Sequence, residues 1–170
     1  MRKQYFILVA ICGLMLLGFR VADIQFPELA AQTLDDKTIT IPKDTKGKFT
    51  LIGLASSQKA QTDLEGWIDP VYKSFTSNPM FQVRMYFVAM AGSNTARVVK
   101  SQLKKQLDAE LQKYVLVYSG DINAIKTTLE MKEKDKPYFF VIDPRGKIIY
   151  STSGAYSEKK MDEISDKLSE

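Results

Sequence analysis

The sequence predicts an α/β protein, a three-layer sandwich in which a mixed central sheet is flanked by helices. Two patterns predict this class. From residue 48 onward, apolar runs of strand length alternate with stretches of helical periodicity, and the chain closes with a strand–turn–strand pattern followed by a helix. The length of 170 residues is enough for one domain with a sizeable core and hardly enough for two.

The expected strands are short apolar runs bounded by turn residues. Residues 23–46 form an arm in this prediction, with one short strand at 38–41 that ends at Pro42 because proline cannot donate to a sheet ladder. The strands of the body are then residues 49–55, 81–91, 114–118, 138–143 and 148–150. The last two are joined by the turn 144–147, so we expect a hairpin at the end of the sheet.

The first helix is predicted by six apolar residues at i, i+3, i+4, i+7, i+8 and i+11, which share one helix face. They are Leu64, Trp67, Ile68, Val71, Tyr72 and Phe75. Trp67 is therefore expected in the core. Pro70 lies inside this stretch and predicts a kink, because proline removes one backbone donor.

Three more helices follow. Ser93 or Asn94 is the candidate N-cap of a second helix that we expect to continue to Leu111. A short helix follows Asp121, and a final helix begins near Ser157. The residues expected to face the core are Val99, Leu103, Leu107 and Leu111, then Ile122, Ile125 and Leu129, then Met161, Ile164 and Leu168.

The composition excludes most covalent chemistry. The chain has no histidine, and its single cysteine is Cys12, inside an apolar N-terminal run. Thiol–disulfide exchange, Ser-His or Cys-His catalysis and nearly every zinc site need residues that the rest of the chain does not have. No pair of carboxylates has a separation that can be inferred, so we expect a protein that is not an enzyme and has no metal ion or cofactor.

The charge of the body is balanced. Three of the 24 basic residues precede Asp23, while all 20 acidic residues follow Ala22, which leaves 21 basic and 20 acidic residues in the body. A balanced surface gives no electrostatic basis for binding nucleic acid. We therefore expect no nucleic-acid partner.

Residues 1–22 read as a signal peptide or an N-terminal membrane anchor, ahead of a domain over 23–170. Two basic residues precede residues 5–19, which carry no charge. As a helix this run spans roughly 22 Å, less than the ~30 Å hydrocarbon core. Arg20 stands where a cleavage site ending at Ala22 needs a small residue, so a cleaved signal and a retained tether both stay open. Either one predicts a bacterial extracytoplasmic protein, in the periplasm or on the outer face of the inner membrane.

The order of elements resembles the thioredoxin-like superfamily over roughly residues 25–168. The specific match is residues 136–148, similar to the family's proline loop, apolar strand, glycine turn and second strand. The resemblance implies a cis bond between Lys136 and Pro137, which is inexpensive only before proline. Residues 47–57 resemble the strand that delivers the redox loop. Where the family carries Cys-x-x-Cys, this chain has Gln58-Lys59-Ala60-Gln61, so thioredoxin-type redox activity is not expected.

Within that superfamily, the sequence is similar to the mitochondrial ATP synthase assembly factors. The resemblance lies in residues 47–52, in 66–70 of the predicted kinked helix, and in 140–148 followed by Ser153 and Gly154. It implies a role in the biogenesis of a membrane complex.

The candidate binding residues lie in two loops. The first loop follows a sheet strand at its carboxyl end, where open α/β sheets bind ligands. The second surrounds Pro137, where the resemblance implies an open strand backbone that could pair with an extended peptide. The candidates are Ser56, Ser57, Gln58, Lys59, Lys136, Pro137 and Tyr138.

The function predicted from the sequence is protein binding by a redox-inactive, exported or membrane-tethered protein that helps to assemble or stabilise a membrane complex. The alternative is a small-ligand or anion-binding protein that uses a cleft beside the implied cis-proline. The two loops would flank one surface in either case, with Ser56 to Gln61 within about 10 Å of Pro137.

Overall fold

The computed structural model describes residues 24–77 and 82–169. The predicted leader at 1–22, its apolar run at 5–19 and the expected start of the strand 81–91 lie outside these residues. In the described part of the chain, no helix combines the length and the apolar character that crossing a membrane requires.

A seven-stranded mixed sheet forms the centre of the described domain, in the order β2-β1-β5-β4-β3-β6-β7. Strands β3, β4 and β5 run parallel, while β6, β7, β1 and β2 pair antiparallel with their neighbours. The strands are β1 (Leu29–Thr33), β2 (Thr38–Ile41), β3 (Thr50–Ala55), β4 (Arg84–Met90), β5 (Val115–Tyr118), β6 (Tyr138–Ile142) and β7 (Ile148–Ser153). The predicted α/β class with a mixed sheet is confirmed.

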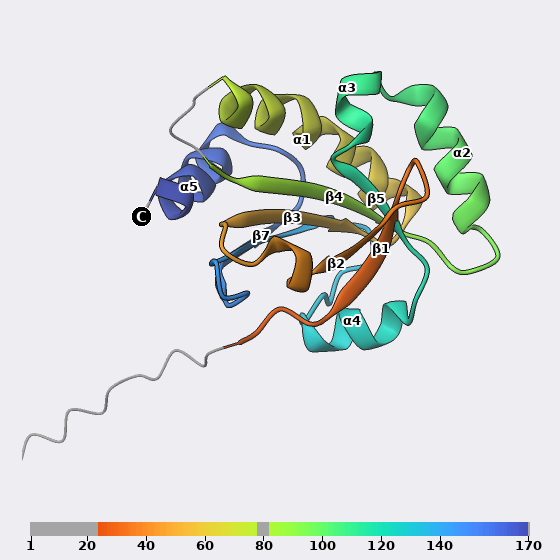
Figure 1. The fold of residues 1–170 in the computed structure, drawn as a ribbon, viewed down its shortest axis with the longest axis horizontal. Coiled ribbons are helices and arrows are strands. Elements are labelled where there is room, and N and C mark those ends of the chain that lie inside the picture. The colour runs from red at the N-terminus through yellow and green to blue at the C-terminus, as the bar shows by residue number, and fades with distance from the viewer. Residues whose placement is uncertain (1–23, 78–81, 170) are drawn as a thin grey trace, which may run out of the picture.

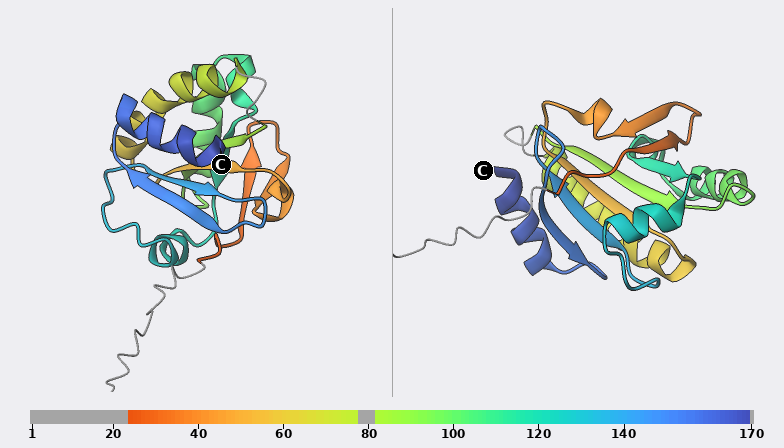
Figure 2. Two further views of the ribbon diagram at one scale, coloured as in Figure 1. Left: turned by 90° about the vertical axis from the view of Figure 1, so that its left-hand side faces the viewer. Right: turned by 90° about the horizontal axis from the view of Figure 1, so that it is seen from below.

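Helices cover both faces of the sheet (Figures 1 and 2). One face carries α1, α2, α3 and α5, and the other carries α4. The helices are α1 (Gln58–Thr76), α2 (Ala96–Gln106), α3 (Ala109–Gln112), α4 (Ile122–Thr128) and α5 (Glu158–Ser169), with a short 3₁₀ turn η1 (Lys43–Thr45) after β2.

Alternation along the strands builds the two halves of the core. In β6, Phe139 and Val141 face α1 and α5, whereas Phe140 and Ile142 face α4. Gly53 of β3 is a close approach point, since a Cβ there would lie 2.7 Å from Leu64 Cδ1 and 2.8 Å from Phe139 Cε1. A side chain at this position would push α1 away from the sheet.

The helix α1 follows its predicted stripe. Trp67 is 0% exposed, which confirms its expected place in the core. Its ring lies 4.1 Å from that of Phe139 between centroids, and its Nε1 donates to Gly154 O at 3.1 Å. Pro70 stays inside α1, and the kink there remains a prediction.

The N-terminal arm contributes more to the sheet than the sequence predicted. Residues Leu29–Thr33 form β1, which the sequence analysis did not identify, and β1 pairs with both β2 and β5. Alanine has low strand propensity, so the two consecutive alanines gave no strand signal. Pairing with two neighbours makes these residues a strand.

The second predicted helix is wrong at both ends. Its N-cap is Thr95 rather than Ser93 or Asn94, because the Gly92 carbonyl accepts from both Thr95 N and Ala96 N and closes a turn before the helix. The helix also stops at Gln106. Gln112 Nε2 donates to the carbonyl oxygens of Lys104 and Leu107, at 3.1 and 3.0 Å, which the end of a helix leaves without intrahelical partners. The chain therefore turns into α3 before β5.

Candidate functional site

The β3–α1 loop lies at the carboxyl end of the parallel strands. Ser56 and Ser57 follow β3 directly, and β4 ends beside it because Ala55 pairs with Ala89. Ser57 Oγ accepts from Ala60 N at 3.1 Å and so caps α1. The Ser56 hydroxyl is shielded from solvent and has no hydrogen-bond partner among the described residues.

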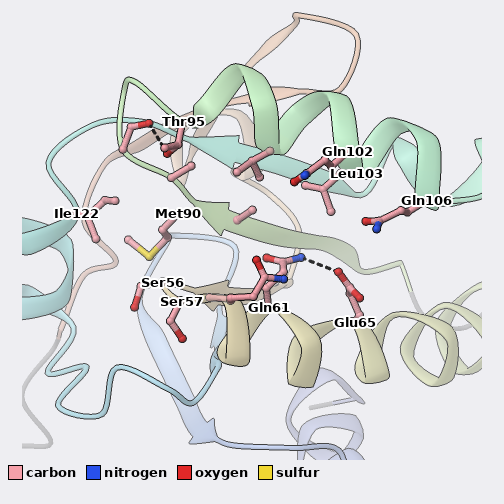
Figure 3. A pocket seen from close by; sticks show the side chains of 16 residues that line it. Ser56, Ser57, Gln61, Glu65, Met90, Thr95, Gln102, Leu103, Gln106 and Ile122 are labelled. Carbon is pink, nitrogen blue, oxygen red and sulfur yellow. Dashed lines mark hydrogen bonds between the residues drawn. The ribbon is translucent and has the colours of Figure 1, made fainter.

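A cavity of about 300 Å³ opens over these strand ends, between α1 and α2. Its floor includes Ala89 and Ala91, and its α2 wall includes Val99 and Leu103. Figure 3 shows side chains of α1 and α2 facing each other across it. We call this feature the amide-lined groove, defined by its polar wall residues Gln58, Gln61, Glu65, Thr95, Gln102 and Gln106.

The groove is rich in side-chain amides and poor in charge. Gln61 Nε2 donates to Glu65 Oε1 at 3.4 Å along α1 (Figure 3). Gln102 and Gln106 extend from α2 toward this pair. Glu65 is the charged residue of the lining, and neither lysine nor arginine lines the cavity. Each amide offers both hydrogen-bond donors and an acceptor, so this lining suits a neutral or cationic polar ligand.

Only part of the first predicted loop lines the groove. Ser56, Ser57 and Gln58 line the groove, whereas Lys59 does not. Lys59 is exposed and its Nζ lies 3.2 Å from Asp63 Oδ2 on the same helix. The sequence analysis did not identify Glu65, Thr95, Gln102 or Gln106 as site residues, since their relation across two helices leaves no local motif.

The second predicted group lies beside the first loop but faces elsewhere. Leu54 pairs with Tyr138, so Ala55 and Pro137 leave the sheet side by side. The Tyr138 side chain packs on the α4 face of the sheet, opposite the α2 side, and its hydroxyl accepts from Glu133 N at 2.8 Å. The two loops therefore lie at adjacent ends of the paired strands β3 and β6, while Tyr138 does not line the groove.

Lys136 and Pro137 have structural partners of their own. Lys136 Nζ lies 2.8 Å from Glu133 Oε2, and the hydrogen bond and attraction of this carboxylate raise the pKa of Lys136. Pro137 is buried, and its carbonyl accepts from Gly154 N at 2.8 Å. Neither residue lines the groove.

The implied cis bond before Pro137 is wrong. In the described residues the cis peptide precedes Pro42, and the Lys136–Pro137 bond is trans. The trans form is the ordinary preference of an X-Pro bond, by about 0.5–1 kcal/mol. Tyr138 packs on the α4 face, whereas the groove lies between α1 and α2, and the expected cleft between the two loops stays a prediction.

The described lining of the groove carries hydroxyl, amide and carboxylate groups and no thiol. Cys12, the single cysteine of the sequence, lies outside the described residues. Within residues 24–77 and 82–169, no group of three acidic, histidine or cysteine side chains is placed to hold a metal ion.

Sequence comparison identifies the family. The model of the ATP10 protein family matches residues 22–169. The chain belongs to the ATP10 family. The ATP10 match spans the whole described domain, including the groove and both predicted loops, and it confirms the resemblance to ATP synthase assembly factors. No curated protein matches the sequence.

Structure comparison places this ATP10 family member among thioredoxin-like folds. The thioredoxin domain of a thiol-disulfide oxidoreductase from Bacteroides vulgatus is 13% identical, with a TM-score of 0.62, covering 87% of this chain and 97% of that one. The exposed lipoprotein thioredoxin of Streptococcus pneumoniae is 20% identical, with a TM-score of 0.58, covering 84% and 98%. Yeast Sco1 is 13% identical, with a TM-score of 0.57, covering 85% and 94%. These likenesses show the fold alone.

Proposed function

We propose that this protein is a redox-inactive, exported or membrane-tethered member of the ATP10 family. It binds other proteins and supports the assembly of a membrane complex, for which the family name favours an ATP synthase. The observation that carries the proposal is the family match together with a β3–α1 loop of serine, glutamine and lysine residues in a thioredoxin-like fold.

The loop supports binding rather than exchange. Two of the structural neighbours are a thiol-disulfide oxidoreductase domain and a thioredoxin, and thiol–disulfide exchange needs a thiolate. In this chain the corresponding helix begins with Ser57 as its cap and Gln58 in its first turn. These groups donate and accept hydrogen bonds, and neither is a thiol that could take part in disulfide exchange.

Complementation tests the assembly role. A strain that lacks the gene is expected to contain less intact ATP synthase on a native gel, with subassemblies accumulating instead. The full chain should restore the intact complex, and Trp67→Ala, which removes a core side chain, serves as a destabilised control. Normal ATP synthase in the deletion strain would contradict the assembly role.

Redox inactivity and export are tested separately. The purified full chain should not accelerate insulin reduction by dithiothreitol above the uncatalysed rate, and a Cys12→Ser variant should behave in the same way. Acceleration that disappears in Cys12→Ser would overturn redox inactivity. In intact spheroplasts, external protease should digest the domain, whereas protection of the domain would contradict an extracytoplasmic location.

The groove also supports a second candidate function, the binding of a small ligand. Its volume of about 300 Å³ lies at the low end of the range of ligand pockets. Because no lysine or arginine lines it, the ligand in this case is neutral or cationic rather than an anion. A rise of several degrees in melting temperature with one member of a metabolite library would favour this function, since ligands that bind the native state stabilise it.

A further inference from the structure

The shape of the amide-lined groove fits an extended chain. Along α2, Thr95, Val99, Gln102 and Gln106 line it at spacings of four, three and four residues, so they follow one helix face for about 16 Å. An extended polypeptide rises about 3.3 Å per residue, and roughly five residues therefore cover this wall. The opposite wall is shorter and comes from the first two turns of α1.

The chemistry of the groove fits a polypeptide backbone. An extended segment presents alternating N–H and C=O groups, and a glutamine side chain can pair with either. The side chains of Gln58, Gln102 and Gln106 make no hydrogen bond to another residue in the described part of the chain, and Gln102 and Gln106 point toward α1 (Figure 3). Their hydrogen-bonding capacity is therefore free for a ligand.

The remaining lining sets the preferred side chains. Ala91, Val99 and Leu103, which belong to the core cluster on the α1 and α2 face, form the apolar part of the groove, which a leucine-sized side chain can cover. Glu65 supplies the negative charge, with no lysine or arginine in the lining to neutralise it. A basic side chain beside Glu65 is attracted, and an acidic one is repelled.

We propose that the amide-lined groove binds an extended segment of a partner protein about five residues long, with a large apolar side chain over Ala91, Val99 and Leu103 and a lysine or arginine beside Glu65. This inference rests on the proposed function, because it names the surface and the partner chemistry of the same binding activity. It places the partner on the α2 side of the β3–α1 loop rather than beside Pro137.

Two fluorescein-labelled nonapeptide pools test the proposal with the full chain in detergent. Both have flanking positions drawn from glycine, serine, threonine and alanine; one carries Leu-Lys-Leu at its centre and the other Leu-Glu-Leu. Fluorescence anisotropy should show binding of the lysine pool, about threefold tighter than the glutamate pool, as expected for a partly exposed charge pair. If neither pool bound with a dissociation constant below about 1 mM, the proposal would be overturned.

Two pairs of variants locate the binding. Gln102→Ala/Gln106→Ala should weaken binding of the lysine pool at least about tenfold through lost hydrogen bonds. Its matched control is Ser101→Ala/Lys105→Ala, which changes exposed α2 residues outside the lining and should bind as the unmodified chain does. Glu65→Lys should reverse the preference toward the glutamate pool, whereas Asp166→Lys on α5 should not. Equal binding by the two α2 variants, or an unchanged preference in Glu65→Lys, would overturn the proposal.

Failure of this inference differs from failure of the proposed function. If the peptides do not bind but the full chain restores ATP synthase assembly in the deletion strain, the groove is not the partner site and the assembly role stands. If the peptides bind as expected but the deletion strain assembles ATP synthase normally, the groove proposal stands and the assembly role falls. The circular dichroism spectrum of each variant checks that it has folded.

Discussion

Helix α1 packs closely against the sheet on the side toward α5, whereas on the side toward α2 it borders a cavity. On the side toward α5, Trp67 fills the space above the sheet, with its ring 4.1 Å from Phe139 and 5.3 Å from Tyr156 between centroids. Its indole N–H is paired with Gly154 O. On the side toward α2, the space is left as a cavity of about 300 Å³.

The difference separates stability from binding along one helix. The later turns of α1 bury Trp67, Val71 and Phe75, which removes apolar surface from water. The first turns carry Gln58, Gln61 and Glu65, whose polar side chains line the groove. These side chains contribute little to the stability of the fold and can bind a partner. Substitutions on the α5 side should therefore change stability, and substitutions on the α2 side should change binding.

Trp67→Ala is expected to have the largest effect on stability. Removing this fully buried side chain leaves a cavity, an unpaired carbonyl at Gly154 and lost ring contacts, at a cost of about 3–5 kcal/mol in the free energy of unfolding. Urea denaturation measures it. Val98→Ala is the control, since Val98 is 58% exposed and should change stability by less than about 0.5 kcal/mol. A loss below about 1.5 kcal/mol for Trp67→Ala would show that the α5 side is not the main support of α1.

Gly53→Ala should have the next largest effect. Its new Cβ would overlap Leu64 Cδ1 and Phe139 Cε1, and overpacking of this kind costs about 1–3 kcal/mol. Gly66→Ala is a matched control on the exposed face of α1, with nothing within 4 Å of its Cβ. It should stabilise the protein by about 0.5–1 kcal/mol through helix propensity. Thermal unfolding measures the melting temperatures of both variants. A shift of both melting temperatures in the same direction would contradict the close packing at Gly53.

The sequence predicts the packing of α1 on the α5 side well, because the pattern that indicates burial lies within single segments. The apolar stripe of α1 recurs with helical spacing, and the alternation of β6 separates Phe139 from Phe140, so burial follows from one segment at a time. The break between α2 and α3 was not predictable in this way. It depends on the side chain of Gln112 reaching back to Lys104 O and Leu107 O.

The groove is harder to predict because it exists only between segments. Gln61 and Gln102 are typical solvent-facing residues of their own helices, and only the parallel pairing of β3 with β4 brings these helices together. The loop at Ser56 and Ser57 was identifiable because strand ends of α/β sheets are common ligand sites. The expectation at Pro137 came from family resemblance, and its trans bond shows that family geometry did not transfer to that residue.

Ser57 both lines the groove and caps α1, and Ser57→Ala tests its contribution to stability. Loss of the bond from Ala60 N to Ser57 Oγ should cost about 1 kcal/mol, and Ser57→Asp should retain the cap. The neighbouring Ser56→Ala is the control, because its shielded hydroxyl has no partner to lose and its removal should be neutral or stabilising. Chemical denaturation distinguishes them. Equal losses at both serines would contradict a capping role for Ser57.

Gln58→Ala and Lys59→Ala should each lower stability by less than about 0.5 kcal/mol, as exposed residues do. Their effects on binding should differ, because Gln58 lines the groove and Lys59 points to Asp63. Binding of the lysine peptide pool should weaken in Gln58→Ala and stay unchanged in Lys59→Ala. The reverse order would move the binding surface to the outer side of α1.

The smallest expected effect concerns the outer face of α2, which is tied to the β1–β2 turn by two exposed ion pairs. Hydrogen bonds from Lys104 to Asp35 and from Lys100 to Asp36, together with the attraction of these lysines, lower the pKa of both carboxyl groups from 3.8. A carboxyl group with a lowered pKa in the folded state contributes stability above its unfolded pKa and loses that contribution as the pH falls through the folded value. Stability should therefore decline below about pH 4 slightly more steeply in the unmodified chain than in Asp35→Asn/Asp36→Asn.

Melting temperatures between pH 6 and pH 2 would measure the difference, with Asp162→Asn/Asp166→Asn on α5 as the matched control. Because solvent screens exposed pairs, the difference should shrink further in added salt, and a difference that grows with salt would show that attraction within these pairs does not cause it.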